Sequence, residues 1–180
     1  MRIVSGRLGG RRIDAPPGND TRPTSDRVRE ALFSALGPLD GEHALDLFAG
    51  SGALGIEALS RGAATAVFVE NDWRAGKVIA ANLQALDLQA PDAILRRRDA
   101  LAALRDAREA GESYDLVFLD PPYRLATGLG PELASALAPV LAPGARVIGE
   151  SDRRTPLDLP GLLTTFERRY GDTLLRIHTA

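Results

Sequence analysis

The sequence predicts an α/β fold in which a mostly parallel sheet ends in an antiparallel hairpin. From Ala44 onward, short apolar runs alternate with helical stretches, a pattern that indicates a parallel sheet covered by helices on both faces. After Ile148 the helical rhythm ends, and two strand-like segments flank the turn sequence at residues 170–172. These observations predict a doubly wound sheet with a terminal hairpin.

Each expected element has its own local signal. Apolar runs predict strands at residues 44–49, 65–69, 93–95, 116–119 and 146–148, and the terminal pair at residues 163–169 and 173–178. Helical periodicity predicts helices at residues 53–60, 73–86, 100–109 and 131–141. Each of these helices ends near a glycine, a proline or a short polar break, which are common signals for helix termination.

The first forty residues predict a small extension before the sheet. Residues 3–4 and 12–14 read as short strands around a glycine turn. A helix that Ser25 or Asp26 can cap is expected to run to about Leu36. Residues 1–29 contain seven arginines and three aspartates, so this part of the chain is basic. We therefore divide the chain into a basic hairpin and helix, residues 1–40, and a main domain, residues 41–180.

Composition limits the classes of function. The chain of 180 residues has no cysteine and only two histidines, so it offers neither a disulfide framework nor a cysteine or histidine cluster for a metal. No segment reaches the roughly 18 uninterrupted apolar residues of a membrane span, and the first residues contain no apolar signal core. We expect a cytoplasmic protein without a metal. The net charge of -2 argues against binding a polyanion over the whole surface.

A glycine-rich loop follows the first strand of the main domain. Gly50, Gly52 and Gly55 lie where a buried strand turns into a helix, so the backbone can turn tightly and approach a ligand at the helix N-terminus. Glu70 ends the next strand, 20 residues after Gly50, where a carboxylate can accept both hydrogens of a ribose diol. Both features predict a cofactor that contains a nucleoside.

The glycine spacing alone leaves two cofactor classes open. It also matches the dinucleotide fingerprint, so an NAD-dependent oxidoreductase is an alternative. Asp46, at the start of the loop, favours S-adenosylmethionine, because the sulfonium and ammonium groups of that cofactor are cationic. A dinucleotide would instead bring an anionic pyrophosphate, which a carboxylate opposes.

The strongest signal is the sequence Asp120-Pro121-Pro122-Tyr123 after the fourth strand. Its position at the carboxyl end of that strand places it beside the glycine loop. The Asp120 carboxylate and the Pro121 carbonyl can accept the two N–H bonds of an exocyclic amine, and the paired prolines preorganise these acceptors. Tyr123 can stack on the base. The motif predicts methylation of an amino group on a nucleobase.

Three segments resemble the RsmD-type 16S ribosomal RNA guanine-N2 methyltransferases, and the likeness spans essentially the whole chain. Residues 22–33, Arg-Pro-Thr-Ser-Asp-Arg-Val-Arg-Glu-Ala-Leu-Phe, are similar to the N-terminal signature of that family. Residues 46–55 are similar to its cofactor loop, and residues 120–123 to its catalytic motif. The resemblance implies a Rossmann-like class I methyltransferase fold with a seven-stranded sheet. It also implies guanine in 16S rRNA or the small ribosomal subunit as the substrate.

The resemblance further implies a set of site residues. The glycine loop surrounds the methionine part of S-adenosylmethionine, Glu70 binds its ribose, and Asp99 its adenine. The expected cofactor-binding residues are Asp46, Phe48, Ala49, Gly50, Ser51, Gly52, Glu70, Asn71, Asp99, Ala100 and Asp120. The expected catalytic residues are Asp120, Pro121, Pro122 and Tyr123.

The remaining candidates concern contacts with RNA. Phosphate binding is expected from Arg7, Arg11, Arg12 and Arg22. The alternative for these residues is an ordinary solvated arginine face. Arg22, Arg27 and Arg29 can instead hold the N-terminal helix against the cofactor crevice. Trp73 is expected to pack on its helix beside the cofactor.

Three classes of function are compatible with parts of the sequence: an amino-methyltransferase that acts on RNA, an NAD-dependent oxidoreductase, and a non-catalytic RNA-binding module. An oxidoreductase leaves residues 120–123 without a role, and a non-catalytic RNA-binding module does not explain an intact motif. An adenine-N6 DNA methyltransferase would share the catalytic residues, but it needs a target-recognition domain for which the chain has little length. We therefore predict a monomeric, S-adenosylmethionine-dependent rRNA (guanine-N2)-methyltransferase that binds 16S rRNA or the small subunit.

Overall fold

The described residues, 1–16, 26–121 and 123–180, are built around a seven-stranded sheet with the order β3-β2-β1-β4-β5-β7-β6. In this computed structural model only the backbone is described for residues 123–127. The strands are β1 (His43–Asp46), β2 (Thr65–Val69), β3 (Ala93–Arg96), β4 (Tyr114–Leu119), β5 (Leu141–Asp152), β6 (Leu163–Tyr170) and β7 (Thr173–Thr179). β1 to β5 run parallel, whereas β7 pairs antiparallel with β5 and β6. The predicted parallel sheet with a C-terminal antiparallel hairpin is confirmed.

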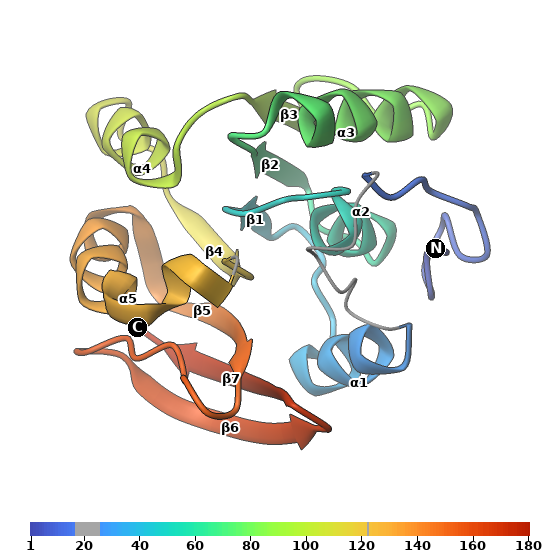
Figure 1. Cartoon of the computed structure of the whole chain (residues 1–180). Helices are drawn as coiled ribbons and strands as arrows, with labels where there is room; N and C mark the ends of the chain where they lie inside the picture. Colours follow the sequence, from blue (N-terminus) through green and yellow to red (C-terminus); the bar gives the residue numbers. More distant parts are fainter. Residues whose placement is uncertain (17–25, 122) are drawn as a thin grey trace.

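Helices cover both faces of the sheet (Figure 1). On one face lie α1 (Asp26–Leu36), α2 (Ala53–Ser60) and α3 (Trp73–Ala85). On the other face lie α4 (Ala100–Glu109) and α5 (Tyr123–Leu137), and a 3₁₀ turn (Ala138–Val140) follows α5. None of the helices in the described ranges has the length and apolar character needed to cross a membrane.

The alternation of side chains along the strands produces two cores. Successive residues of a strand point to opposite faces of the sheet. Ala44 and Phe118 therefore lie in the core under α1, α2 and α3, whereas Leu45 and Val117 lie in the core under α4 and α5. Because the central strands are buried on both faces, they read as continuous apolar runs in the sequence.

The helix predicted over residues 131–141 is wrong at both ends. The helix observed there, α5, begins at Tyr123 and ends at Leu137, although Pro131 reads as a helix start in the sequence. Pro131 instead lies inside α5, next to Gly130. A Cβ on Gly130 would come within 1.9 Å of the carbonyl oxygen of Asp158. This close packing against a distant segment is a tertiary constraint that local propensity does not reveal.

Strand β5 is longer than the run predicted over residues 146–148. It begins at Leu141, which pairs with Tyr114, and a register shift separates this pair from the rest of the β4–β5 ladder. Pro143 and Gly144 favour a loop by local propensity. Antiparallel pairing with β7 extends the strand at its other end to Asp152. Partner strands on both sides therefore set the length of β5.

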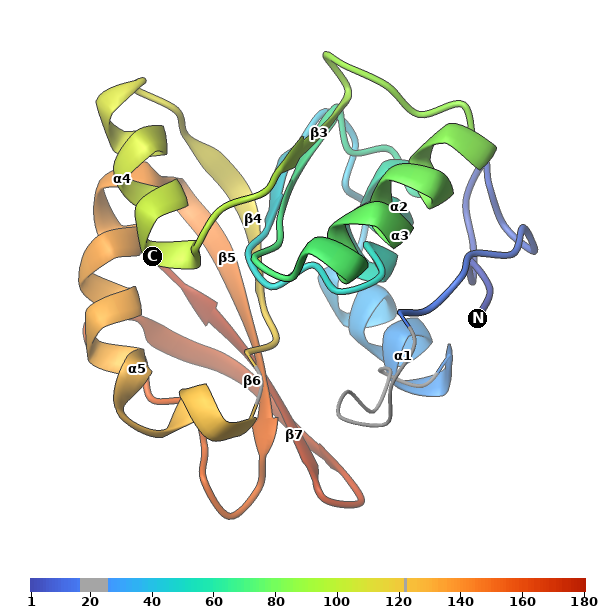
Figure 2. The same cartoon turned by 45° about the horizontal axis from the view of Figure 1, so that its top comes forward.

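Residues 1–16 lie along α2 and α3, on the same side of the sheet as α1 (Figure 2). The expected N-terminal hairpin is short, with one described bridge between Arg2 and Arg12. The buried carboxylate of Glu57 accepts hydrogen bonds from the backbone N–H groups of Val4 and Ser5, at 2.7 and 3.0 Å. The extension also adds buried side chains to the main core, namely Ile3, Leu8 and Ile13. The division of the chain at residue 40 stays a prediction.

Candidate active site

The carboxyl ends of β1, β2 and β4 meet at one edge of the sheet, and the predicted cofactor and catalytic motifs follow these strands. β1 pairs with β2 on one side and with β4 on the other. The helices after β1 and β4, α2 and α5, lie on opposite faces. This reversal is the topological switch point at which open α/β sheets bind ligands. The fold therefore brings the glycine loop, Glu70 and Asp120 to one edge.

The loop after β1 is a tight turn that requires glycine. Gly50 and Gly52 have φ values of 55° and 80°, which side-chain-bearing L residues rarely adopt. The N–H of Gly52 donates to the carbonyl of Ala49 at 2.6 Å, and α2 begins directly after this turn. Gly52 has no side-chain cap, so the start of α2 resembles other helix N-termini that receive polar ligands.

Gly55 has a packing role and not a ligand-binding one. A Cβ at this position would lie 2.4 Å from Cε1 of Phe68, far inside van der Waals contact. The third glycine of the sequence pattern therefore allows α2 to pack closely on β2. Close helix–strand packing is also the role of the last glycine in dinucleotide-binding loops, so Gly55 does not discriminate between the two cofactor classes.

Glu70 connects the end of β2 to the glycine loop. Its Oε2 accepts a hydrogen bond from the N–H of Gly50 at 2.8 Å, and its Oε1 accepts one from the N–H of Asp72 at 2.8 Å. An ionised carboxylate can accept about four hydrogen bonds. Two acceptor positions therefore stay available for a pair of hydroxyl groups, as the ribose interpretation requires.

Asp46 is a buried carboxylate at the end of β1. It is 2% exposed, and Oδ2 accepts a hydrogen bond from the N–H of Gly55 at 3.0 Å. Burial raises the pKa of Asp46 to about 7, the hydrogen bond from Gly55 opposes this rise, and the charge of Glu70 adds to it. The negative charge is thus poorly compensated, and a cation bound nearby would stabilise it.

Asp120, directly after β4, lies beside Glu150 on β5. Leu119 pairs with Gly149 in the parallel ladder, so the next residue on each strand is a carboxylate. Asp120 keeps partial exposure as a residue, but protein surrounds its carboxyl group. Burial raises the pKa of Asp120 well above its usual value, and the charges of Glu150 and Asp46 raise it further. Three carboxylates thus converge on one edge of the sheet.

Parts of the predicted site lie outside the described residues. This applies to Pro122, to the side chain of Tyr123 and to Arg22. Pro121 is described and buried. The roles assigned to these four residues stay predictions.

Asp99 has a local structural role at the start of α4. Its Oδ1 accepts hydrogen bonds from the N–H groups of Leu101 and Ala102, at 3.0 and 3.3 Å, and caps the helix. The predicted contact with adenine stays a prediction. Asn71 is exposed beside Glu70, Phe48 is half-buried after β1, and Ala100 is buried in the core under α4.

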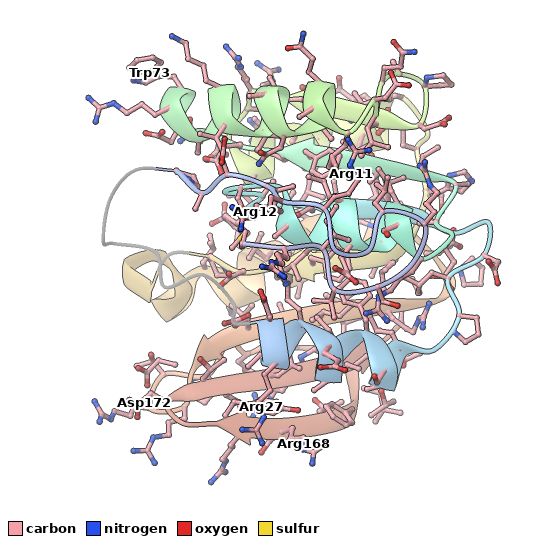
Figure 3. The ribbon with its side chains drawn as sticks, turned by 90° about the vertical axis from the view of Figure 1, so that its right-hand side faces the viewer. Arg11, Arg12, Arg27, Trp73, Arg168 and Asp172 are labelled. Carbon is pink, nitrogen blue, oxygen red and sulfur yellow. The ribbon has the colours of Figure 1, made fainter. Side chains whose placement is uncertain are left out.

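Arg11 and Arg12, two of the predicted RNA-binding arginines, lie on the N-terminal segment beneath α3 in the view of Figure 3. Arg11 donates from Nη2 to the carbonyl of Ala85 at 2.6 Å, at the C-terminal end of α3. Arg12 is exposed, and the exposed Arg7 contacts α2 through its backbone N–H, which donates to the carbonyl of Ser60 at 2.7 Å. Arg7 and Arg11 therefore lie at the C-terminal ends of α2 and α3, and not at the edge that carries Asp46 and Asp120.

Arg29 holds α1 against the N-terminal segment. Its side chain is fully buried, and Nη2 donates to the Asp26 carboxylate at 2.7 Å and to the carbonyl of Arg2. Nη1 lies 3.8 Å from Sδ of Met1, and Met1 Sδ in turn accepts from the Ser51 hydroxyl at 3.3 Å. This chain of contacts links α1 to the glycine loop. Arg27, by contrast, is exposed.

Two further residues of this region were missed by sequence reasoning. The Asn82 amide donates to the carbonyls of Ser51 and Asp14, at 2.9 and 3.0 Å, and so connects the glycine loop to the extension. Its signal in the sequence is an asparagine on the buried stripe that contains Leu83. Glu150 is signalled only by its place two residues after the apolar run at residues 146–148. Within the described ranges, no three His, Cys, Asp or Glu residues are placed to hold a metal.

Solved structures share this fold over nearly the whole chain. An Escherichia coli protein provisionally named a methyltransferase has a TM-score of 0.84 and 36% identity, covering 99% of this chain and 97% of that chain. A provisionally named methylase from Haemophilus influenzae has a TM-score of 0.79 and 30% identity, with the same coverage of 99% and 97%. A provisionally named methyltransferase solved with SAH has a TM-score of 0.71, covering 86% of this chain and 49% of that chain; at 16% identity it shows the fold alone. The fold is that of the S-adenosylmethionine-dependent class I methyltransferases, as the sequence predicted.

Sequence relatives identify the family. Ribosomal RNA small subunit methyltransferase D of Escherichia coli is 42% identical over 125 residues, which are 69% of this chain and 61% of that protein. The protein of the same name from Haemophilus influenzae is 36% identical over 163 residues, covering 89% of this chain and 83% of its own length. The Bacillus subtilis protein YlbH, provisionally named an rRNA methyltransferase, is 46% identical over 125 residues, 69% of this chain and 67% of that protein.

The matched part of this chain thus spans about three fifths of the Escherichia coli relative and two thirds of the Bacillus one. The chain belongs to the family described as conserved hypothetical protein 95, whose family model matches residues 1–179. The predicted resemblance to the RsmD-type proteins is confirmed.

Proposed function

We propose that this protein transfers a methyl group from S-adenosylmethionine to the N2 amino group of a guanine in 16S ribosomal RNA. The observation that carries the proposal is the convergence of Asp46, Asp120 and Glu150 at the switch point of the sheet. Burial and mutual repulsion raise the pKa values of Asp46 and Asp120, so this edge favours a cationic ligand.

The charges at this edge separate the two cofactor classes that the glycine pattern leaves open. An anionic pyrophosphate placed near three carboxylates would be repelled, whereas ammonium and sulfonium groups would be attracted. S-adenosylmethionine, when bound, supplies an electrophilic methyl group on a positively charged sulfur. Asp46 and the loop at residues 48–52 would hold its methionine part, Glu70 its ribose hydroxyls, and the segment around Asn71 and Asp99 its adenine.

Asp120 is proposed to orient the target amine and to take its proton. An exocyclic amine on a base is a poor nucleophile, because its lone pair is delocalised into the ring. The Asp120 carboxylate and the Pro121 carbonyl accept the two N–H bonds, which directs the lone pair away from the ring. The new N–C bond would form as the bond between the methyl group and the sulfonium sulfur breaks, with its electron pair left on a neutral thioether. The amine nitrogen then carries the positive charge and releases one proton to Asp120. A raised pKa makes the Asp120 carboxylate a stronger base and so suits it to accept this proton.

The remaining members of the motif complete the proposed base-binding site. Pro122 continues the rigid turn, and Tyr123 stacks on the base. The target guanine must be unpaired or extruded, because pairing occupies the amino edge of a base within a helix.

Relatives named ribosomal RNA small subunit methyltransferase D support the choice of small-subunit rRNA. The choice of guanine rests on the resemblance of residues 22–33 to the RsmD-type guanine-N2 methyltransferases. The N-terminal extension, residues 1–40, adds phosphate contacts through Arg7, Arg11, Arg12 and Arg22. We propose a cytoplasmic monomer that acts on 16S rRNA or on the small subunit.

The proposal is tested by incubating the protein with isotope-labelled S-adenosylmethionine and either naked 16S rRNA or small ribosomal subunits. Nucleosides are then released and separated by mass spectrometry. N2-methylguanine is the expected labelled product. Labelled methyladenine or methylcytosine would retain the amino-methyltransferase chemistry and overturn the choice of base. Transfer of label to neither substrate would contradict the proposed activity.

A further inference from the structure

Trp73 exposes a large apolar surface at the start of α3. Its residue surface is 56% exposed, although the sequence led us to expect packing on the helix, so that expectation is wrong. Figure 3 shows the indole at the end of α3, pointing away from the ribbon. Tryptophan is highly buried on average, and exposing an aromatic ring of this size to water is unfavourable. A partner that covers the indole would remove this unfavourable exposure to water.

Two cations contact the exposed indole. Lys77 Nζ lies 4.5 Å and Arg74 Cζ 5.6 Å from the centroid of the ring, so both make cation–π contacts. A third cation, Arg97, reaches α3 from the residue after β3. A Cβ built on Gly76 would lie 3.2 Å from Nε of Arg97, so the glycine makes room for this side chain. Since Gly76 lies one helical turn from Trp73, Arg97 adds a positive charge to the same part of α3.

These cations lack carboxylate partners within the described residues. Arg74, Lys77 and Arg97 take part in none of the ion pairs found there. α3 itself contains no acidic residue. The two sequence neighbours of Arg97, by contrast, do form ion pairs: Arg96 with Glu112 and Arg98 with Asp106.

The nearest carboxylate along the chain is already engaged. Asp72 uses Oδ1 to cap α3, accepting from the N–H groups of Arg74 and Ala75 at 2.8 and 2.9 Å. Asp72 keeps its negative charge, but the three cations Arg74, Lys77 and Arg97 outnumber it, so the surface around Trp73 is net positive, although the whole chain carries a net charge of -2. A positive surface around an exposed aromatic ring is complementary to a single-stranded nucleic acid, because bases stack on the ring and cations bind the phosphates.

We propose that Trp73, Arg74, Lys77 and Arg97 form a stacking platform that binds an unpaired base flanking the target nucleotide. The inference rests on the RNA substrate proposed above. The position of this platform fits that role, because Trp73 follows Glu70 by only three residues. It therefore lies close to the edge of the sheet at which the cofactor is proposed to bind. The indole receives one base of the flanking single strand, and the three cations bind the adjoining phosphates.

The first test uses the fluorescence of the protein itself. The chain contains one tryptophan, so its emission reports on this platform alone. The intact protein, without cofactor, is titrated with a single-stranded RNA oligonucleotide and with its duplex. We expect the single strand to quench the emission along its binding curve, and the duplex, whose bases are already stacked, to quench it much less. Unchanged emission at RNA concentrations that saturate binding by anisotropy would overturn the platform.

The second test separates stacking from charge. Trp73→Ala is expected to weaken single-strand binding by about fivefold to a hundredfold without changing the salt dependence, because no charge is lost. Lys77→Ala is expected to weaken binding and to reduce the slope of log affinity against log salt by about 0.7. Unaltered affinity of the Trp73→Ala protein, with normal thermal unfolding, would contradict the proposal.

Two control variants match these changes elsewhere on the surface. Leu163→Ala removes an exposed apolar side chain from β6, and Arg105→Ala removes a cation from α4, on the opposite face of the sheet. Both are expected to bind RNA as the unaltered protein does. Loss of affinity in these variants equal to that of the platform variants would show nonspecific binding and overturn the assignment.

Cofactor calorimetry distinguishes failure of this platform from failure of the proposed activity. If RNA quenches Trp73 but the protein neither binds S-adenosylmethionine nor methylates RNA, the platform stands and the proposed activity fails. If N2-methylguanine is formed while Trp73→Ala alters neither RNA affinity nor methylation, the platform alone fails.

Discussion

The carboxylate of Glu70 accepts a 2.8 Å hydrogen bond from the backbone N–H of Gly50, so the residue that ends β2 holds the loop that follows β1. The same carboxylate bonds the N–H of Asp72, which caps α3. One side chain therefore supports the glycine loop and the start of α3. In the proposed function it also binds the ribose of the cofactor, so loop geometry and cofactor affinity depend on the same group.

We expect Glu70→Ala to weaken S-adenosylmethionine binding by about 1 to 3 kcal/mol, because charge-assisted hydrogen bonds to the ribose are lost. The free energy of unfolding should also fall by about 1 kcal/mol as the bond to Gly50 disappears. Calorimetry and denaturant titration measure the two effects. Glu132→Ala on α5 is a matched control expected to change neither. Tight NAD binding in place of S-adenosylmethionine binding would refute the cofactor assignment.

Cofactor affinity should depend on pH through Asp46, whose pKa is raised to about 7. Below that pH, binding of a cation must displace the proton from Asp46, so affinity should rise by up to about tenfold per pH unit and then level off above neutrality. Calorimetry in buffers of different ionisation enthalpy would detect the released proton. A flat profile between pH 5.5 and 8.5 in the unaltered protein would contradict this role.

Asp46→Asn is the control for that profile and has a stability effect of its own. Since the pKa of Asp46 is raised in the folded protein, the folded state binds an extra proton between about pH 4 and pH 7, and stability falls as pH rises through this window. The substituted amide would carry no charge to bury. The variant should therefore unfold with a free energy higher by up to about 4 kcal/mol at pH 8, show little gain near pH 4, and lose the pH dependence of cofactor binding.

Much of the fold and part of the candidate site could be predicted because their signals are local. The glycine turn depends on backbone conformations at Gly50 and Gly52, and the residue types themselves reveal those conformations. Alternating apolar runs and helices determine the sheet in the same way. Glu70 and Asp120 could be proposed because each directly follows a recognisable strand.

The missed features depend on which segments become neighbours in space. Glu150 belongs to the candidate site only because β4 pairs with β5, which places Glu150 beside Asp120. Asn82 connects Ser51 and Asp14, residues far apart in the sequence. Trp73 is expected to pack because tryptophan is a large apolar residue, but it lies outside the buried face of α3 and is exposed. Tertiary contacts of this kind leave little trace in a single sequence.

The extension is expected to bind RNA phosphates through Arg7, Arg11 and Arg12. Replacing all three by alanine should weaken RNA binding and reduce the salt slope by up to about one unit per lost contact. Binding measured by anisotropy at several salt concentrations checks this. Since Arg11 also bonds Ala85, thermal unfolding must be compared. The double variant of Arg105 and Arg108 on α4 is the control for loss of surface charge elsewhere, and an unchanged slope in the triple variant would favour a solvated arginine face.

The proposed role of Asp120 predicts that methyl transfer and cofactor binding respond differently to its replacement. Asp120→Ala should lower kcat by at least about a hundredfold, because the target amine loses both its orienting acceptor and its proton acceptor. Affinity for S-adenosylmethionine should fall only modestly, since Asp46 and Glu70 are unchanged. Calorimetry and single-turnover methylation measure the two quantities, and Asp92→Asn, on an exposed loop, should alter neither.

Asp120→Asn separates the two parts of that role. Its amide oxygen can still accept an N–H bond from the amine, but it cannot take up the proton, so activity should lie between that of Asp120→Ala and the unaltered protein. Burial and the charges of Glu150 and Asp46 raise the pKa of Asp120 in the folded protein. The ionised carboxylate therefore lowers the free energy of unfolding, and this destabilisation increases as pH rises. The asparagine variant should therefore be more stable than the unaltered protein at pH 8. Slower methylation by a more stable protein excludes misfolding as the cause, whereas full activity in both variants would remove Asp120 from the chemistry.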